Sequence, residues 1–109
     1  MIKLNHIPKK KMTKIEEDFS WLLEMQKREG RIKYWGYEKI KLYLGDNCWF
    51  TPDFMLKLHD DSLKLIEVKG AHIWEDSIIK FKTACEQYPF IKFEMHQYKN
   101  KRWKLIRQN

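Results

Sequence analysis

Apolar residues recur along the chain with two different periods, and these periods predict its helices and strands. Over residues 13–29 they recur about every 3.6 positions, which predicts an amphipathic helix. Thr13 and Glu16 have the spacing of a capping box at its start, and Gly30 follows its end. A second helix is predicted over residues 74–88. Its apolar positions at helical spacing are Trp74, Ile78, Phe81, Cys85 and Tyr88.

Between and after these helices, the pattern changes to that of strands. Residues 37–44 alternate, and residues 31–34 form a connection or a strand start. Residues 49–58 and 63–69 are rich in aromatic and aliphatic residues, and the turn-forming sequence His-Asp-Asp-Ser joins them, which predicts a hairpin. Residues 90–97 alternate again. The predicted order is helix, three strands, helix, strand, an α/β fold around a small mixed sheet.

The predicted hairpin brings acidic and basic side chains together. Successive side chains on a strand point to opposite faces, so Glu67 and Lys69 share one face and Val68 takes the other. Pairing of the two strands places Asp53 across from the Glu67 end. We therefore expect two carboxylates and one ammonium group to converge at one spot.

This convergence has a chemical meaning. Two close carboxylates repel each other unless a positive charge lies between them. Oxygen ligands of this kind suit Mg²⁺, which binds one or two carboxylates together with water and a substrate phosphate. The alternative is an ordinary Glu–Lys pair on a surface hairpin.

Length and composition narrow the class of protein. A chain of 109 residues, 43% hydrophobic and 15% aromatic, is expected to form one folded domain. The sequence has no apolar run that could span a bilayer and no signal-peptide pattern, so no membrane partner is expected. Cys48 and Cys85 lack metal-ligand spacing, and the four His residues are scattered. We expect reduced cysteines, no zinc site and a cytoplasmic location.

The net charge of +7 comes from the two ends of the chain. Residues 1–14 and residues 99–109 each carry five basic residues and no acid, whereas residues 15–98 have a net charge of −3. We read residues 1–12 as an extended or flexible basic arm and residues 99–109 as a basic C-terminal segment. Basic ends suit contact with a polyanion, although they also favour solubility. The basic residues expected to touch nucleic-acid phosphates are Lys9, Lys10, Lys11, Lys101 and Arg102.

Part of this pattern resembles a known nuclease superfamily. The sequence Pro52-Asp53, thirteen intervening residues and then Glu67-Val68-Lys69 resembles the PD-(D/E)XK signature. The longer string TPDF…IEVKG, followed by a helical stretch ending in Tyr88-Pro89, is similar to a family of small phage and prophage proteins. That family is placed among the PD-(D/E)XK endonucleases, near Holliday-junction resolvases. The resemblance runs from about Thr13 to about Phe93.

The resemblance implies a restriction-endonuclease-like core over residues 13–98 and a Mg²⁺-dependent endodeoxyribonuclease, with Mn²⁺ as a substitute metal. Asp53, Glu67 and the Val68 carbonyl would be the metal ligands, and Lys69 would position or activate the attacking water. Glu16 matches a glutamate that approaches the metal site in the family, although it could serve only to close the capping box.

The resemblance leaves several alternatives open. Lys80 and Lys82 match lysines typical of the family, so either one of them touches the scissile strand or both lie on an ordinary solvated helix face. The expected partner is DNA, by resemblance branched DNA in the cytoplasm of a phage host. The sequence does not decide between a monomer and a homodimer. A catalytically silent nucleic-acid-binding module and a phage accessory protein that binds a host factor are the rival functions. The aromatic residues of the predicted sheet that could stack on bases or cover the core are Trp35, Tyr37, Tyr43 and Trp49.

Overall fold

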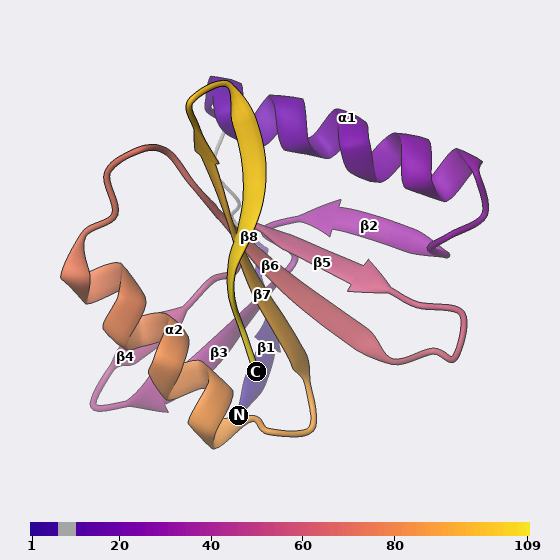
Figure 1. The fold of residues 1–109 in the computed structure, drawn as a ribbon. Coiled ribbons are helices and arrows are strands. Elements are labelled where there is room, and N and C mark those ends of the chain that lie inside the picture. The colour runs from indigo at the N-terminus through magenta and orange to yellow at the C-terminus, as the bar shows by residue number, and fades with distance from the viewer. Residues whose placement is uncertain (7–10) are drawn as a thin grey trace.

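Two β-sheets and two helices make up the fold (Figure 1). The computed structural model describes residues 1–6 and 11–109. One sheet has three strands in the order β1-β3-β4, and the other has five strands in the order β2-β5-β6-β7-β8. The elements, in chain order, are β1 (Ile2–Leu4), α1 (Lys14–Arg28), β2 (Tyr34–Tyr37), β3 (Ile40–Gly45), β4 (Cys48–Phe50), β5 (Phe54–Lys57), β6 (Leu63–Lys69), α2 (Glu75–Gln87), β7 (Lys92–Lys99) and β8 (Arg102–Gln108).

The first helix begins and ends as its sequence predicts. The Glu16 backbone N–H donates to Thr13 Oγ1, and the Thr13 backbone N–H donates to Glu16 Oε1, so both halves of the capping box are present. At the other end, Gly30 has a φ of +79°, a conformation that glycine adopts without steric cost. Helix α1 buries Phe19 and Leu23 against the five-stranded sheet.

The five-stranded sheet is mixed, and its connections explain why. Hairpins join β5 to β6 and β7 to β8, so both pairs are antiparallel. Asn100 and Lys101 both have positive φ in the second hairpin, as a tight two-residue turn requires. Strands β6 and β7 are parallel, because α2 carries the chain back across the sheet between them.

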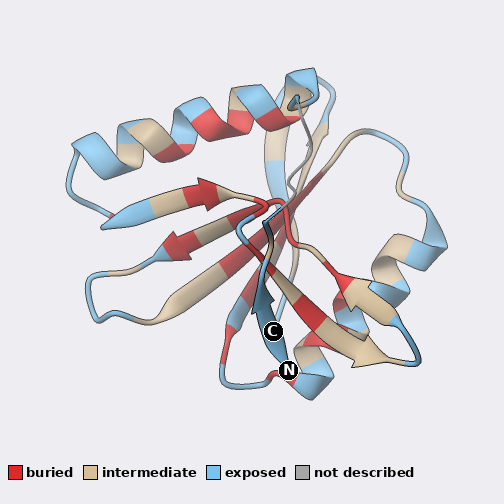
Figure 2. Cartoon of the chain, turned by 180° about the vertical axis from the view of Figure 1, so that it is seen from behind, coloured by how far each residue is buried: buried red, intermediate tan, exposed pale blue. Residues whose placement is uncertain are grey.

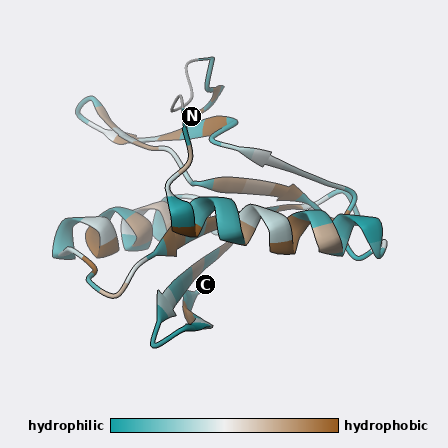
Figure 3. Ribbon diagram, turned by 90° about the horizontal axis from the view of Figure 1, so that it is seen from above, coloured by the Kyte–Doolittle hydropathy of each residue, from teal (hydrophilic) through white to brown (hydrophobic). Residues whose placement is uncertain are grey.

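Two hydrophobic cores lie on opposite sides of this sheet. Phe54 and Leu56 pack with the buried face of α1, which crosses the sheet in Figure 3. The other core joins residues of β6 and β7 to α2 and to the three-stranded sheet. Its fully buried members, with no exposed side-chain surface, are Leu42, Ala84, Phe93 and Met95. The domain therefore has a central sheet covered on both faces, and the expected α/β class with a mixed sheet is confirmed.

Several expected elements differ from the structure. The strand expected over residues 37–44 is split at Glu38, whose φ is +48°, and the strand expected over residues 49–58 is split before Phe54. Pro52 lies in the second break, where its missing N–H could not continue a ladder. Glu38 N donates to Asp53 O at 2.9 Å, so the two breaks lie side by side. At both breaks the chain passes from one sheet to the other.

The ends of the chain and the second helix also bring corrections. Residues 2–4 of the expected arm form β1, which pairs antiparallel with β3, so this part of the arm belongs to a sheet. The basic C-terminal segment 99–109 contains β8, so it too belongs to a sheet. Helix α2 lies over residues 75–87 as predicted, but Trp74 is 71% exposed and is no part of its buried stripe. The buried residues of α2 are Phe81, as expected, and Ala84, which the prediction did not include. Within the described ranges, no helix is long and apolar enough to cross a membrane.

A charged cluster on β6 and β7 gives the fold a testable pH dependence. Glu94 lies 2.9 Å from His96 Nε2 and 3.0 Å from Lys64 Nζ. The hydrogen bond with His96, together with the Lys64 contact, lowers the pKa of Glu94 to about 2. Because this pKa is depressed in the folded state, the stabilisation is present above the unfolded value of about 4.3 and is lost as the pH falls toward 2.

We therefore expect Glu94→Gln to lower the free energy of unfolding at pH 7. The decrease should be only about 1 kcal/mol, because partial solvent exposure screens the cluster. The difference from the wild type should shrink as the pH falls from 5 to 3. Urea unfolding at pH 7, 5, 4 and 3 measures this, with the exposed Glu86→Gln as control. An equal difference at every pH would show that the Glu94 charge does not stabilise the fold.

Candidate active site

The β5–β6 hairpin places the candidate residues, and its turn forms as expected. Asp61 has a φ of +68°, and its N–H donates to Leu58 O, while the Ser62 N–H donates to Asp60 Oδ1. The resulting register pairs Phe54 with Ile66. Asp53 therefore enters the sheet beside Glu67, as the sequence predicted.

Two reciprocal hydrogen bonds join these two acids. The Asp53 backbone N–H donates to Glu67 Oε1 at 2.9 Å. The Val68 backbone N–H donates to Asp53 Oδ2, also at 2.9 Å. Asp53 and Glu67 are each only 7% exposed, so both carboxyl groups are held in fixed positions away from bulk water.

Lys69 supplies the one positive charge that is paired with these acids among the described residues. Its Nζ lies 3.2 Å from Glu67 Oε2 and donates to Ser77 Oγ at 3.3 Å. Ser77 belongs to the first turn of α2, so this helix begins beside the site. With 23% of its side chain exposed, against 9% for Glu67, Lys69 lies at the solvent side of the group.

Glu16 reaches the same group from α1. It is buried, and its Oε1 accepts hydrogen bonds from the Thr13 backbone N–H and from the Tyr37 hydroxyl at 3.0 Å. A side-chain hydrogen bond with Glu16 is also among the contacts that raise the pKa of Asp53. Glu16 thus closes the capping box and also lies against the candidate site. The two alternatives expected for this side chain therefore do not exclude each other.

The electrostatics of the site follow from this crowding. Burial, and next the charge of Glu67, raise the pKa of Asp53 to about 9, against the hydrogen bond from Val68 that lowers it. Burial likewise raises the pKa of Glu67, although Lys69 opposes the shift. Three acidic side chains share one ammonium group, so the site favours a bound proton or a bound cation.

The donor set can be compared with what a hard cation requires. Asp53 Oδ2 and Glu67 Oε1 accept backbone hydrogen bonds, and Glu67 Oε2 lies 3.2 Å from Lys69 Nζ, so a cation bound here would share the carboxyl oxygens with these donors. Two carboxylates with a nearby main-chain carbonyl match the ligands of Mg²⁺, which keeps several of its waters. Over residues 1–6 and 11–109, no group of three or more His, Cys, Asp or Glu side chains is already arranged around a common metal position. The chemistry of the donors therefore suits Mg²⁺, with water and substrate completing the shell.

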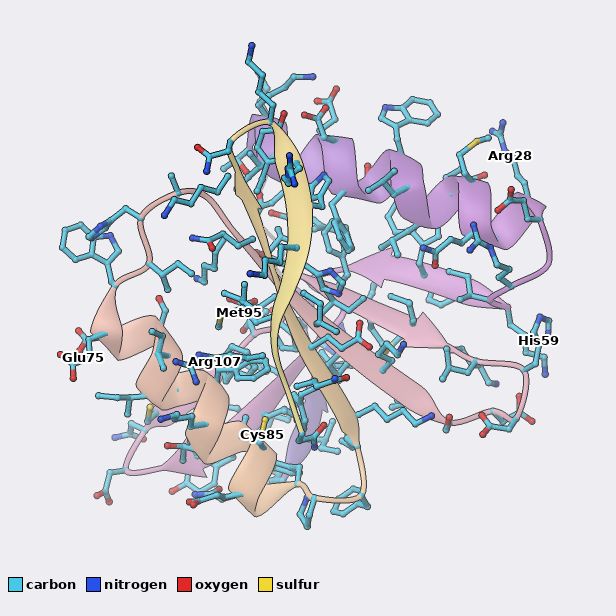
Figure 4. All side chains as sticks on the ribbon, in the orientation of Figure 1. Arg28, His59, Glu75, Cys85, Met95 and Arg107 are labelled. Carbon is cyan, nitrogen blue, oxygen red and sulfur yellow. The ribbon has the colours of Figure 1, made fainter. Side chains whose placement is uncertain are left out.

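The basic residues expected at DNA lie on several surfaces. Lys80 extends from α2 to the carbonyl of Trp49, at 3.1 Å. Lys82 lines a hollow of about 580 Å³ between α2 and β8, near Cys85 and Arg107 (Figure 4). Lys101 and Arg102 are exposed at the β7–β8 turn, and Lys11 is exposed before α1. The remaining two, Lys9 and Lys10, lie outside the described residues.

Three contacts at the site were not anticipated from the sequence. Tyr37 holds Glu16, and Ser77 holds Lys69. The Gln97 amide donates to the carbonyls of Gly70 and Ala71, which fixes the chain just after Lys69. These three side chains come from three different elements, and no local spacing links them to the motif.

Comparison with known proteins adds no relative. No protein-family model, no curated protein and no solved structure matches the chain.

Proposed function

We propose that this protein is a metal-dependent endodeoxyribonuclease of the PD-(D/E)XK type. The observation that carries the proposal is the convergence of Asp53, Glu67 and Lys69 on the β5–β6 hairpin, with Glu16 beside them. A central mixed sheet with α1 on one face and the crossover helix α2 on the other is compatible with the restriction-endonuclease-like core that the motif implies.

Each residue then has a role that its position supports. Asp53, Glu67 and the Val68 carbonyl would hold Mg²⁺, with Mn²⁺ as a substitute. The metal, when bound, supplies a lowered pKa for water and stabilisation of charge on a phosphoryl group. Lys69 orients the attacking water or neutralises the phosphate, and Ser77 holds its ammonium group in place. Glu16 keeps a carboxylate beside Asp53.

Access to the site gives the substrate a direction of approach. Asp53 and Glu67 are nearly buried, whereas Lys69 is the most exposed member of the group. A scissile phosphate would therefore approach past Lys69 and the start of α2. The β7–β8 turn, with Lys101 and Arg102, would hold more distant phosphates by charge. Branched DNA is the proposed substrate on the strength of the motif alone.

A binding module without catalysis is the second candidate. The observation that favours it is hydrogen bonding within the site, because every buried side-chain N and O atom among the described residues has a partner. Such a network can stabilise a fold without chemistry. A buried acidic cluster with a single lysine, however, lowers the stability of the fold unless its unpaired charge is neutralised.

Incubation of the purified protein with supercoiled plasmid distinguishes the two candidates. We expect nicking or linearisation in Mg²⁺ and in Mn²⁺, and none in EDTA. A panel of linear, single-stranded, flap and four-way DNA then identifies the substrate. DNA binding without cleavage of any panel member, in either metal, would support the binding module and overturn the nuclease proposal.

A further inference from the structure

The outer face of the three-stranded sheet carries a second group of side chains with a shared chemistry. Its inner face, with Ile40, Leu42 and Phe50, packs against α2. Alternation along the strands turns the neighbouring side chains outward. The register pairs Lys3 with Lys41 and Tyr43 with Trp49, so these four residues form one contiguous surface, which we call the aromatic–basic face. Figure 2 views the molecule from the side of this sheet.

Aromatic and basic groups are in direct contact on the aromatic–basic face. The Lys3 and Lys41 ammonium groups lie 5.1 and 5.0 Å from the centre of the Trp49 ring. The Tyr43 and Trp49 rings are 5.2 Å apart at an angle of 63°. Lys80 adds a third cation at the edge, through its bond to the Trp49 carbonyl. Strands β1, β3 and β4 contain no Asp or Glu, so the face is positively charged.

This combination fits one class of ligand. Nucleobases stack on aromatic rings, and ammonium groups on flexible stems bind the phosphates between them. A duplex hides the faces of its bases inside the stack, whereas a single strand exposes them. A second copy of this chain would place lysines against lysines if it docked through the same face. We propose that the aromatic–basic face binds single-stranded nucleic acid.

The location of this face relates it to the candidate active site without depending on nuclease activity. Trp49 precedes Asp53 by four residues, which can span at most about 14 Å. The backbone at Trp49 is therefore no farther than this from the backbone at Asp53. A hollow of about 670 Å³ lies beside the aromatic–basic face and is lined by Lys3, Asn5, His6 and Lys41. It offers further polar contacts for the backbone of a bound nucleic-acid strand.

Binding measured in EDTA tests the proposal independently of cleavage. Fluorescence anisotropy of labelled oligothymidylate and of a duplex of equal length gives both affinities. We expect Trp49→Leu to weaken oligothymidylate binding at least about fivefold, the loss of one stacked base, and to change duplex binding less than twofold. The double variant Lys3→Gln, Lys41→Gln should weaken oligothymidylate binding even if Trp49→Leu is poorly folded.

The matched control is Lys27→Gln, Lys92→Gln, which removes the same charge from exposed positions in the last turn of α1 and at the start of β7. If this control weakens oligothymidylate binding as much as the Lys3, Lys41 variant, the effect is one of net charge and the proposal fails. Unchanged oligothymidylate affinity in the aromatic–basic face variants overturns it as well. A change of oligomeric state in those variants without a change of affinity would instead assign the face to contact between copies. Binding is measured in EDTA and cleavage in Mg²⁺, so loss of the nuclease proposal and loss of this one are separable.

Discussion

Replacing Asp53 by asparagine is expected to abolish DNA cleavage and leave the protein folded. Asparagine keeps an oxygen that can accept the Val68 N–H, so the local backbone geometry is retained. It removes the charge that would hold a cation between Asp53 and Glu67. We expect single-turnover cleavage in Mg²⁺ to fall by about 10³-fold, the upper range for loss of one positioned electrostatic group.

The same substitution should not destabilise the protein when divalent cations are absent. Burial and the charge of Glu67 raise the pKa of Asp53 to about 9, so without a cation asparagine replaces a carboxyl group that is already mostly neutral at pH 7. Urea unfolding in EDTA should give Asp53→Asn a free energy of unfolding equal to or above that of the wild type. Glu67→Gln should behave alike in cleavage, and the exposed Asp76→Asn serves as control. Cleavage by Asp53→Asn within tenfold of the wild type would remove Asp53 from the site.

Lys69→Ala is expected to lose turnover far more than it loses DNA binding. A general phosphate anchor is one of many basic groups in this chain, so its removal should change the affinity by only a few-fold. A group that acts on the attacking water or on developing charge matters mainly in the transition state. We therefore expect the cleavage rate at saturating DNA to fall by about 10²-fold.

Lys64→Ala is the matched control for Lys69→Ala. It lies on the same strand, its side chain is 25% exposed against 23%, and it too is paired with a glutamate. Titration of branched and linear duplexes in Ca²⁺ gives the affinity, and single-turnover cleavage in Mg²⁺ gives the rate. Equal rate losses in the two variants would show that Lys69 acts through stability. A near wild-type rate for Lys69→Ala would make it only an anchor.

Local sequence signals located the helices and the central hairpin. The capping box at Thr13 and the turn around Asp61 are decided by neighbours within a few residues, so their chemistry is readable in the sequence. The hairpin register then follows, which is why Asp53 and Glu67 could be placed together. The expected position of Lys69 beside Glu67 is confirmed for the same reason.

Features decided by distant contacts could not be read in this way. Alternation continues across Glu38 and Pro52, yet the chain leaves one sheet for the other at both places. Trp74 has the spacing of a buried residue but stands before the first turn of α2, where its side chain is mostly exposed. The contacts of Tyr37 with Glu16 and of Ser77 with Lys69 depend on how α1 and α2 pack. None of these features leaves a periodic pattern in the neighbouring sequence from which it could be predicted.

The crossing of the chain between the two sheets has a mechanical consequence. Asp53 stands at the crossing itself, with its carbonyl bonded to Glu38 at the other crossing and its N–H bonded to Glu67 in the central sheet. Any tilt of the small sheet against the large one must therefore move the backbone of Asp53. A movement of the small sheet would change the distance between the Asp53 and Glu67 carboxyl groups. The rigidity of the crossing at Asp53 and Glu38 therefore determines how well this acidic pair keeps its alignment.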